Sequence, residues 1–151
     1  MNESRNENTA TLINILKKIP LFSTLDENLH REIINHIILM YYPVNYVLFR
    51  EGDEGDAMYI IKKGKVQIYH EPKEEGDPSR KVAHLMDNDF FGEMALISEI
   101  PRNASAKVTE ESEIFILSKS DFKKLLNTNT VLAEQISKTV VERLKDNDLK
   151  K

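Results

Sequence analysis

Between residues 38 and 118 the chain is divided into short apolar or alternating runs by turns rich in glycine, proline and aspartate. Runs of this length bounded by glycine turns are typical of antiparallel strands and hairpins. The runs lie at residues 44–49, 58–61, 66–69, 82–86, 104–109 and 113–117. Counting a start near Ile38, the pattern predicts seven or eight short strands, with a turn at Gly64 and the charged residues 71–80 as a hairpin tip.

Helical spacing of apolar residues occurs on both sides of this strand region. Before it, a helix is predicted over residues 9–18, ending ahead of Pro20, and a second helix is predicted to start at an Asp26 N-cap. After it, a short helix capped by Ser118 or Ser120 precedes a long one over about 129–146. The apolar stripe of that last helix is Leu132, Ile136, Val140 and Leu144. The predicted fold is α+β: an antiparallel β-roll, or jelly roll, flanked by N-terminal helices and two C-terminal helices.

Length and composition exclude several classes of protein. A chain of 151 residues supports one domain, here predicted over residues 9–151 behind a flexible tail at 1–8, with the roll at about 38–118 and the last helices at 119–147. There is no cysteine, and 21 basic against 25 acidic residues give a net charge of −4. Such a chain is a poor binder of DNA or of an anionic membrane by its overall field. It has no apolar run of about 20 residues and no leader, so we expect a cytoplasmic protein with no nucleic-acid or membrane partner.

Residues 90–106, Phe-Phe-Gly-Glu-Met-Ala-Leu-Ile-Ser-Glu-Ile-Pro-Arg-Asn-Ala-Ser-Ala, fit neither a strand nor a long helix. Gly92 stands where a turn would meet a helix of one or two turns, whose first backbone N–H groups can bind an anion. Arg102 follows, and a guanidinium suits a phosphate. Glu93 could accept a hydrogen bond from a hydroxyl. Taken singly, each of these residues is more often an ordinary turn or surface residue, but together they predict a site for a phosphate attached to a hydroxyl-bearing group.

This segment resembles the phosphate-binding cassette of cyclic nucleotide-binding domains, the regulatory modules of the catabolite activator protein, of cyclic-nucleotide-dependent kinases and of cyclic-nucleotide-gated channels. The resemblance extends from about Leu12 to Leu144. Residues 51–66, with Gly52 and Gly64, are similar to the core of the family's β-roll, and the last helix is similar to the helix that closes over the ligand.

The resemblance implies a role for each matching residue. Glu93 would bind the ribose 2′-hydroxyl, Arg102 the cyclic phosphate, and Gly92 would allow close approach of the ribose. The rest of the implied binding site is Met94, Ala95, Asn103 and Ala104 in the cassette, Ile68, Val82 and Leu85 against the purine, and Arg143 on the last helix.

Two positions depart from the family pattern. Relatives often have Ser, Thr or Ala after the arginine, and Thr there is associated with cyclic GMP, whereas this chain has Asn103. The expected ligand is therefore cyclic AMP, with cyclic GMP as the alternative. A glycine that often precedes Asp-Phe-Phe is replaced by Asn88, which also tolerates a left-handed turn.

No enzyme, cofactor or metal is expected. The four histidines are scattered without a His-x-His pair, no catalytic triad or carboxylate pair can be argued, and the family binds its nucleotide without cleaving it. The leading hypothesis is a stand-alone receptor that changes conformation on binding and signals to a separate protein. The last helix could also pair two subunits. The alternatives are an interaction protein that has lost nucleotide binding and a regulatory fragment of a larger channel, kinase regulator or transcription factor.

Overall fold

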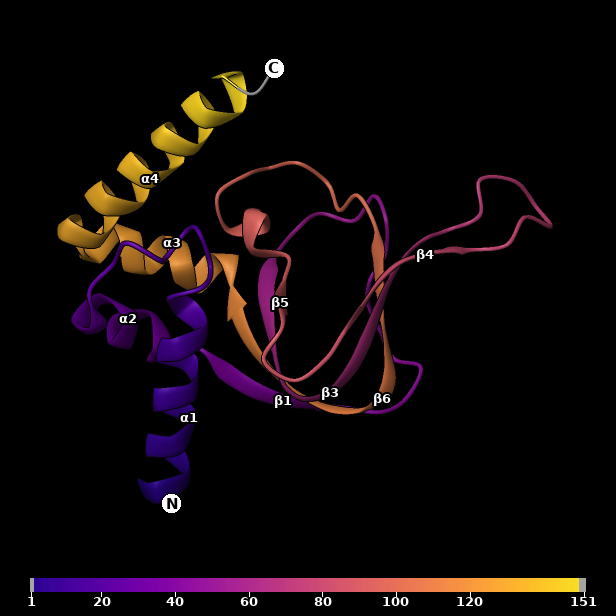
Figure 1. Ribbon diagram of the computed structural model, residues 1–151, viewed down its shortest axis with the longest axis horizontal. Helices are drawn as coiled ribbons and strands as arrows, with labels where there is room; N and C mark the ends of the chain where they lie inside the picture. Colours follow the sequence, from indigo (N-terminus) through magenta and orange to yellow (C-terminus); the bar gives the residue numbers. More distant parts are fainter. Residues whose placement is uncertain (1, 150–151) are drawn as a thin grey trace. The chain divides into compact units, whose positions relative to one another are not determined.

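The computed structural model describes residues 2–149, and the side chains of residues 7–143. The chain divides into two compact units, one helical, from residues up to His36 and from Ser120 onward, and one built of strands, Ile37–Lys119 (Figure 1). The α+β class with an antiparallel β-roll is confirmed. Within the described residues no helix has both the length and the apolar character to cross a membrane.

The helical unit contains α1 (Asn2–Leu16), α2 (Glu27–Ile34), most of α3 (Lys119–Thr128) and α4 (Thr130–Leu149). The Asp26 carboxylate caps α2 by accepting from the Leu29 N–H at 2.9 Å, as predicted. Phe22 and Phe122 are both fully buried and meet edge to face, with ring centroids 5.8 Å apart. Aromatic burial and edge-to-face geometry of this kind make a stable core contact between distant segments.

The helix boundaries differ from the prediction at the N-terminus. Helix α1 begins at Asn2 rather than at Thr9. The prediction relied on apolar periodicity, which residues 2–8 lack, but Glu and Arg are adequate helix formers and can extend a helix whose packed part lies further along. At the other end, Asn129 is the cap of α4 and accepts from the Leu132 N–H at 3.0 Å. The predicted stripe residue Leu144 and the terminal Lys150 and Lys151 lie outside the described side chains.

The strand unit is one antiparallel sheet wound into a roll (Figure 1). Its strands run in the order β1–β6–β3–β4, and β2 and β5 join β6 and β3 at their sides. The bounds are β1 Ile38–Tyr42, β2 Val47–Phe49, β3 Ala57–His70, β4 Arg80–Leu85, β5 Phe90–Phe91 and β6 Ser105–Ser118. The two long strands β3 and β6 pair from Ala57↔Ser118 to Tyr69↔Ser105 and carry most of the buried core.

The described part of the chain therefore has six strands instead of seven or eight. The runs 58–61 and 66–69 are one strand, and so are 104–109 and 113–117. Gly64 is not a hairpin turn: it has φ +131° inside β3, and a Cβ on it would lie 2.0 Å from Ser112 Oγ. A glycine inside a strand often marks such an irregularity with close approach of another backbone, which the turn interpretation overlooked.

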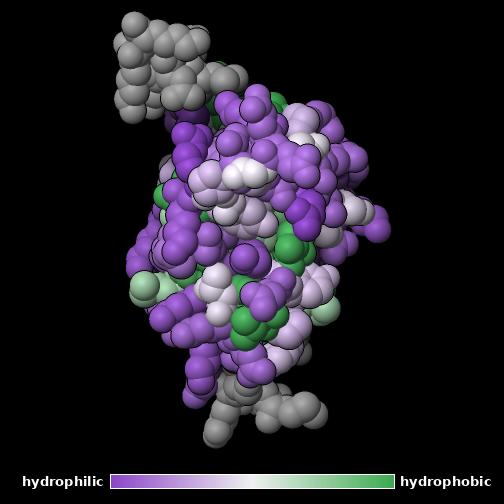
Figure 2. All heavy atoms as spheres, turned by 90° about the vertical axis from the view of Figure 1, so that its right-hand side faces the viewer, coloured by the Kyte–Doolittle hydropathy of each residue, from purple (hydrophilic) through white to green (hydrophobic). Residues whose placement is uncertain are grey.

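Two other turn predictions are confirmed. Residues 71–79 connect the antiparallel pair β3 and β4, and residues 72–82 are all exposed. The surface on this side is mostly hydrophilic, and apolar side chains show only in small separate groups (Figure 2). Asn88 adopts φ +73°, as expected for the residue that replaces a glycine. The turn it makes leads into β5, which pairs with β3 and places the next segment beside it.

Candidate functional site

The segment after β5 starts with a left-handed glycine. Gly92 has φ +77° and precedes the 3₁₀ helix η1 (Glu93–Leu96), a shorter helix than the predicted one to Ser98. A Cβ on Gly92 would lie 2.6 Å from Arg102 Nη1 and 3.3 Å from the Ala57 carbonyl oxygen. Glycine is thus required here twice, for the backbone conformation and for the space that the arginine occupies.

Arg102 is a buried cation held mainly by backbone and aromatic groups. The whole residue is 9% exposed. Its Nη2 donates to the Ala57 carbonyl at 2.7 Å and Nη1 donates more weakly to the Gly92 carbonyl at 3.5 Å. The guanidinium carbon lies 4.1 Å from the centre of the Phe49 ring, a cation–π distance. Nε is buried and has no hydrogen-bond partner within the described residues. The guanidinium is therefore held in place, but one of its hydrogen-bond donors is unsatisfied there.

The charge of Arg102 has little compensation nearby. The Asp56 carboxylate lies 3.9 Å from Nη2, but that side chain is 82% exposed to water. Burial raises the pKa of Tyr59 to about 12, so this neighbour is a neutral phenol at physiological pH. Burial also lowers the pKa of Arg102, against the opposing effects of Tyr59, Asp56 and Asp53. A guanidinium nevertheless remains protonated in proteins, and a buried cation without a close, dry counter-charge favours a bound anion.

A hollow of about 360 Å³ opens beside this guanidinium. It brings together six of the predicted site residues, which are Gly92, Glu93, Met94, Ala95, Arg102 and Asn103. The lining is completed by Ser98, Ile100 and Pro101. Ala104 follows directly and is buried. Residues 92–95 and 98–103 thus surround one space with an acid, an arginine and an amide side chain.

The remaining predicted residues do not line this hollow. Ile68 and Leu85 lie on β3 and β4 and pack against the buried cluster of the roll. Val82 is 55% exposed on β4, where the β3–β4 register is irregular. Arg143 lies on α4, in the helical unit, and its Nη1 is buried without a hydrogen-bond partner among the described residues.

Sequence reasoning missed the residues that hold the arginine in place. The Phe49 ring lies against the guanidinium. The turn after Phe49 binds the backbone of Arg102: the Gly52 N–H donates to the Arg102 carbonyl at 2.7 Å, and the Arg102 N–H donates to the Asp53 carbonyl at 2.8 Å. Gly55 leaves room for Ala95, whose Cβ would lie 2.8 Å from a Cβ on Gly55. The two glycines of this turn were a visible signal, but a turn motif does not reveal which distant segment it meets.

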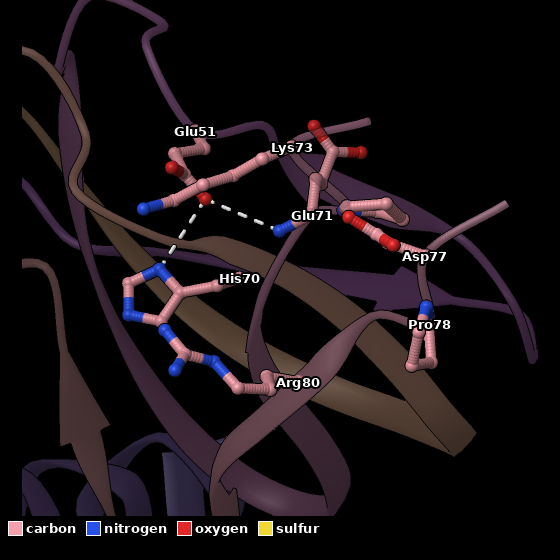
Figure 3. A pocket seen from close by; sticks show the side chains of 8 residues that line it. Glu51, His70, Glu71, Lys73, Asp77, Pro78 and Arg80 are labelled. Carbon is pink, nitrogen blue, oxygen red and sulfur yellow. Dashed lines mark hydrogen bonds and ion pairs between the residues drawn. The ribbon is translucent and has the colours of Figure 1, made fainter. Parts of the chain in front are cut away.

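A second hollow of about 490 Å³ lies at the base of the β3–β4 hairpin. His70 and the Glu71 backbone nitrogen both point toward the Glu51 carboxylate (Figure 3), at 3.3 and 3.2 Å. Hydrogen bonding from Glu71 N–H, and then from His70, lowers the pKa of Glu51. The hollow is lined by the acids Glu51, Glu71 and Asp77 and by His70, Lys73, Arg80, Pro72 and Pro78. No group of three or more His, Asp or Glu side chains in the described part of the chain could hold a metal ion.

An antiparallel β-roll in which a buried arginine with little charge compensation lies beside a small hollow is typical of a module that binds a small anionic molecule. The match to known families specifies it further. The family model described as "Cyclic nucleotide-binding domain" matches residues 39–129, so the chain belongs to that family, as the cassette resemblance predicted. Cyclic nucleotide binding is thus supported by the family, whose members are binding modules and not catalytic domains.

Several curated proteins are similar in sequence. The chain is 30% identical to the Cyclic AMP receptor protein of Thermus thermophilus over 134 residues, which are 89% of this chain and 61% of that protein. It is 33% identical over 129 residues to a cyclic nucleotide-gated potassium channel of Rhizobium etli, covering 85% of this chain and 34% of the channel. A cAMP-dependent protein kinase regulatory subunit of Colletotrichum orbiculare is 32% identical, over 74% of this chain and 27% of the subunit. The chain therefore spans less than two thirds of these relatives.

Solved structures agree with this assignment. The N-terminal domain of a transcriptional regulator from Streptomyces coelicolor has a TM-score of 0.76 at 25% identity, covering 89% of this chain and 92% of that one. The Thermus thermophilus catabolite activator protein has a TM-score of 0.63 at 30% identity, covering 87% of this chain and 61% of that one.

Proposed function

We propose that this protein is a receptor for a cyclic nucleotide, with cyclic AMP preferred, and that binding changes its conformation in a way that a separate protein recognises. It needs no cofactor and catalyses no reaction in this role. The observation that carries the proposal is the Arg102 guanidinium: buried, fixed by Phe49 and the Ala57 carbonyl, with Nε unpartnered in the described chain, beside a 360 Å³ hollow.

Each lining residue has a role in this proposal. The cyclic phosphate takes the position beside Arg102 and the backbone N–H groups of Ala95 and Ala104, because charge-assisted bonds in a dry site are the strong ones. The Glu93 carboxylate accepts from the ribose 2′-hydroxyl, and Gly92 lets the sugar approach. Met94 and Asn103 form the rim. The purine lies against Ile68, Val82 and Leu85.

The preference for cyclic AMP depends on Asn103. The family's threonine associated with cyclic GMP is absent at this position. Some relatives are named for cyclic AMP and others for cyclic GMP. The chain is 30% identical to the Cyclic AMP receptor protein of Thermus thermophilus and 31% identical to a cGMP-dependent protein kinase of Caenorhabditis elegans. Overall similarity thus does not discriminate between the bases, and the proposed preference rests on the residue after the arginine.

The signalling partner is a protein, which we place in the cytoplasm with the receptor because a cysteine-free chain fits a reducing compartment. A second copy of the chain is one such partner. Val131 and Val141 on α4 are 55% and 50% exposed and could pair two subunits through this helix. Sedimentation with and without cyclic AMP tests this pairing.

The deciding experiment is calorimetric titration of the whole chain with cyclic AMP, cyclic GMP and 5′-AMP. We expect saturable binding of cyclic AMP, weaker binding of cyclic GMP, and little binding of 5′-AMP, whose phosphate is not closed into the ring. Tighter binding of cyclic GMP would reverse the proposed preference. The absence of heat and of any thermal-melt shift with both cyclic nucleotides at millimolar concentration would overturn the proposal and favour an interaction protein that retains only the fold.

A further inference from the structure

Lys119 is a nearly buried lysine at the point where the chain leaves the roll. It is the last residue of the strand unit and the first residue of α3, and it is 8% exposed. Its Nζ donates to the Ser98 carbonyl at 2.7 Å and pairs with Glu99 Oε1 at 3.0 Å. Lysines are rarely buried unless they are paired. The partners of this ammonium are the Ser98 carbonyl and the Glu99 carboxylate.

The backbone of Lys119 is joined to the other side of the arginine site. Its N–H donates to the Asp56 carbonyl at 2.8 Å. The next residue, Ala57, supplies the carbonyl that accepts from Arg102 Nη2 at 2.7 Å, and the Asp56 carboxylate lies 3.9 Å from the same nitrogen. One residue thus connects the start of β3, which holds the arginine, with the exit of the cassette.

The exit of the cassette is part of the hollow itself. Ser98 lines the hollow beside Arg102, and its hydroxyl donates to the Met94 carbonyl of η1 at 2.9 Å. A movement of η1 toward an anion at Arg102 would therefore displace Ser98 and with it the acceptor of the Lys119 ammonium.

The position of this lysine on its helix is electrostatically unfavourable by itself. A cation at a helix N-terminus is opposed by the helix dipole, which favours an acid there. Glu99 is only a partial reason for the lysine, because the Glu99 side chain is 73% exposed and water competes for its carboxylate. The Ser98 carbonyl, reached by a buried donor, is the contact that explains the residue.

We infer that Lys119 is a positioning residue that couples occupancy of the Arg102 site to the first turns of α3. This inference rests on the proposed function and adds its route of regulation. Ligand at Arg102 shifts the cassette, the Ser98 carbonyl carries that shift to Lys119, and Lys119 transmits it along the chain into α3. The residue touches no ligand, so it affects coupling more than affinity.

The test is amide hydrogen exchange of the whole chain, with and without saturating cyclic AMP, read over residues 120–126. In the wild type, cyclic AMP should change exchange there by about fivefold or more, the lower end of typical coupling between sites. Lys119→Met keeps the length of the side chain and removes the donor. It should bind cyclic AMP within about tenfold of wild type and lose the exchange change, and Lys119→Arg should restore it.

Matched controls separate coupling from general damage. Lys65→Met removes an exposed lysine paired with Glu110 at 3.5 Å and should behave as wild type in both readouts. Glu99→Gln should keep most of the coupling, since the carbonyl contact remains. If Lys119→Met does not fold in a ligand-free melt, Lys119→Gln, which shortens the donor and removes the charge, makes the same comparison.

The possible outcomes separate a failure of the Lys119 coupling role from a failure of the proposed receptor function. If the wild type binds no cyclic nucleotide, the proposed function fails. If the wild type binds but residues 120–126 do not respond, or if Lys119→Met binds and still shows the full response, the coupling role is overturned while the receptor function stands.

Discussion

Two hollows lie on the described part of the roll, and the smaller of these two has the better chemistry for an anion. The hairpin hollow has about 490 Å³ and three acids, two bases and a histidine around it, whereas the cassette hollow has about 360 Å³ and one buried arginine. In the hairpin hollow two of the three acids already have partners: the Glu51 carboxylate interacts with His70 and accepts from the Glu71 N–H, and the Glu71 carboxylate pairs with Arg50. In the cassette, Arg102 keeps an unsatisfied Nε within the described chain.

The difference favours the cassette hollow as the candidate site on the grounds of burial and an unsatisfied hydrogen-bond donor, and not of volume. Exposed pairs are screened by water and gain little from a ligand. A buried cation has already lost its hydration, and fixed carbonyls and a ring replace it only in part, so an incoming phosphate adds interactions that water no longer supplies. The two hollows are close in the chain, because the 50–53 turn contributes Glu51 to one and bonds the Arg102 backbone in the other.

The strongest test of this contrast removes one arginine from each hollow. Arg102→Gln should weaken cyclic AMP binding by about 2–5 kcal/mol, at least about thirtyfold, because a buried charge-assisted contact is lost. Arg80→Gln, on the rim of the hairpin hollow, should stay within about twofold. Calorimetry measures both, and circular dichroism of the free proteins checks that each folds. Equal losses in the two variants would show that the overall charge, and not the buried guanidinium, attracts the ligand.

Two glycines with positive φ allow a second comparison. Gly92 at +77° meets Arg102 Nη1 at 2.6 Å from a built Cβ, whereas Gly76 at +92° in the hairpin loop meets nothing within 4 Å. Alanine at either position costs up to about 1–2 kcal/mol of stability for the left-handed conformation. Only Gly92→Ala should also displace the guanidinium and reduce cyclic AMP affinity, by about tenfold or more, as measured by titration at a temperature where both variants are folded. If Gly76→Ala reduced affinity equally, the steric argument would be wrong.

Much of this site was predictable because its signals are local. Gly92, Glu93 and Arg102 lie within eleven positions of the chain, and the turn, the acid and the cation could be recognised there without any knowledge of distant contacts. The Asp26 cap and the left-handed Asn88 are local in the same sense, since each depends on the conformation of one residue and its immediate neighbours.

The rest depends on contacts between distant residues. Nothing near Phe49 in the sequence indicates that it lies under Arg102, 53 positions later (102 − 49). Gly64 was predicted as a turn because glycine permits both turns and irregular strand pairs, and only Ser112 on the paired strand decides between them. Lys119 reads as an ordinary surface lysine until Ser98 is placed beside it.

The Glu93 carboxylate gives a smaller expected effect than the arginine. It lines the cassette hollow and is only partly buried, so water can replace some of what it provides to a ribose hydroxyl. Glu93→Gln should weaken cyclic AMP binding by roughly 1–2 kcal/mol, about five- to thirtyfold, without changing the free protein's melt. The 2′-deoxy analogue of cyclic AMP supplies the control: wild type should lose affinity for it, and Glu93→Gln should bind both ligands nearly alike. If Glu93→Gln still bound the 2′-deoxy analogue much more weakly than cyclic AMP, the carboxylate would have a role other than binding the 2′-hydroxyl.

The smallest expected effect on binding belongs to Glu51 in the hairpin hollow. The Glu71 N–H and His70 hold the pKa of Glu51 below its ordinary 4.5, so its stabilising contribution is present above that value and is lost as the pH falls through the lower pKa of the folded state. Glu51→Gln lacks this contribution at every pH, so its melting temperature should differ from wild type above about pH 4.5 and converge with it in stronger acid. Cyclic AMP affinity at neutral pH should be unchanged. A clear loss of affinity in Glu51→Gln would mean that the two hollows act as one site through the 50–53 turn, because Gly52 and Asp53 of this turn bond the Arg102 backbone.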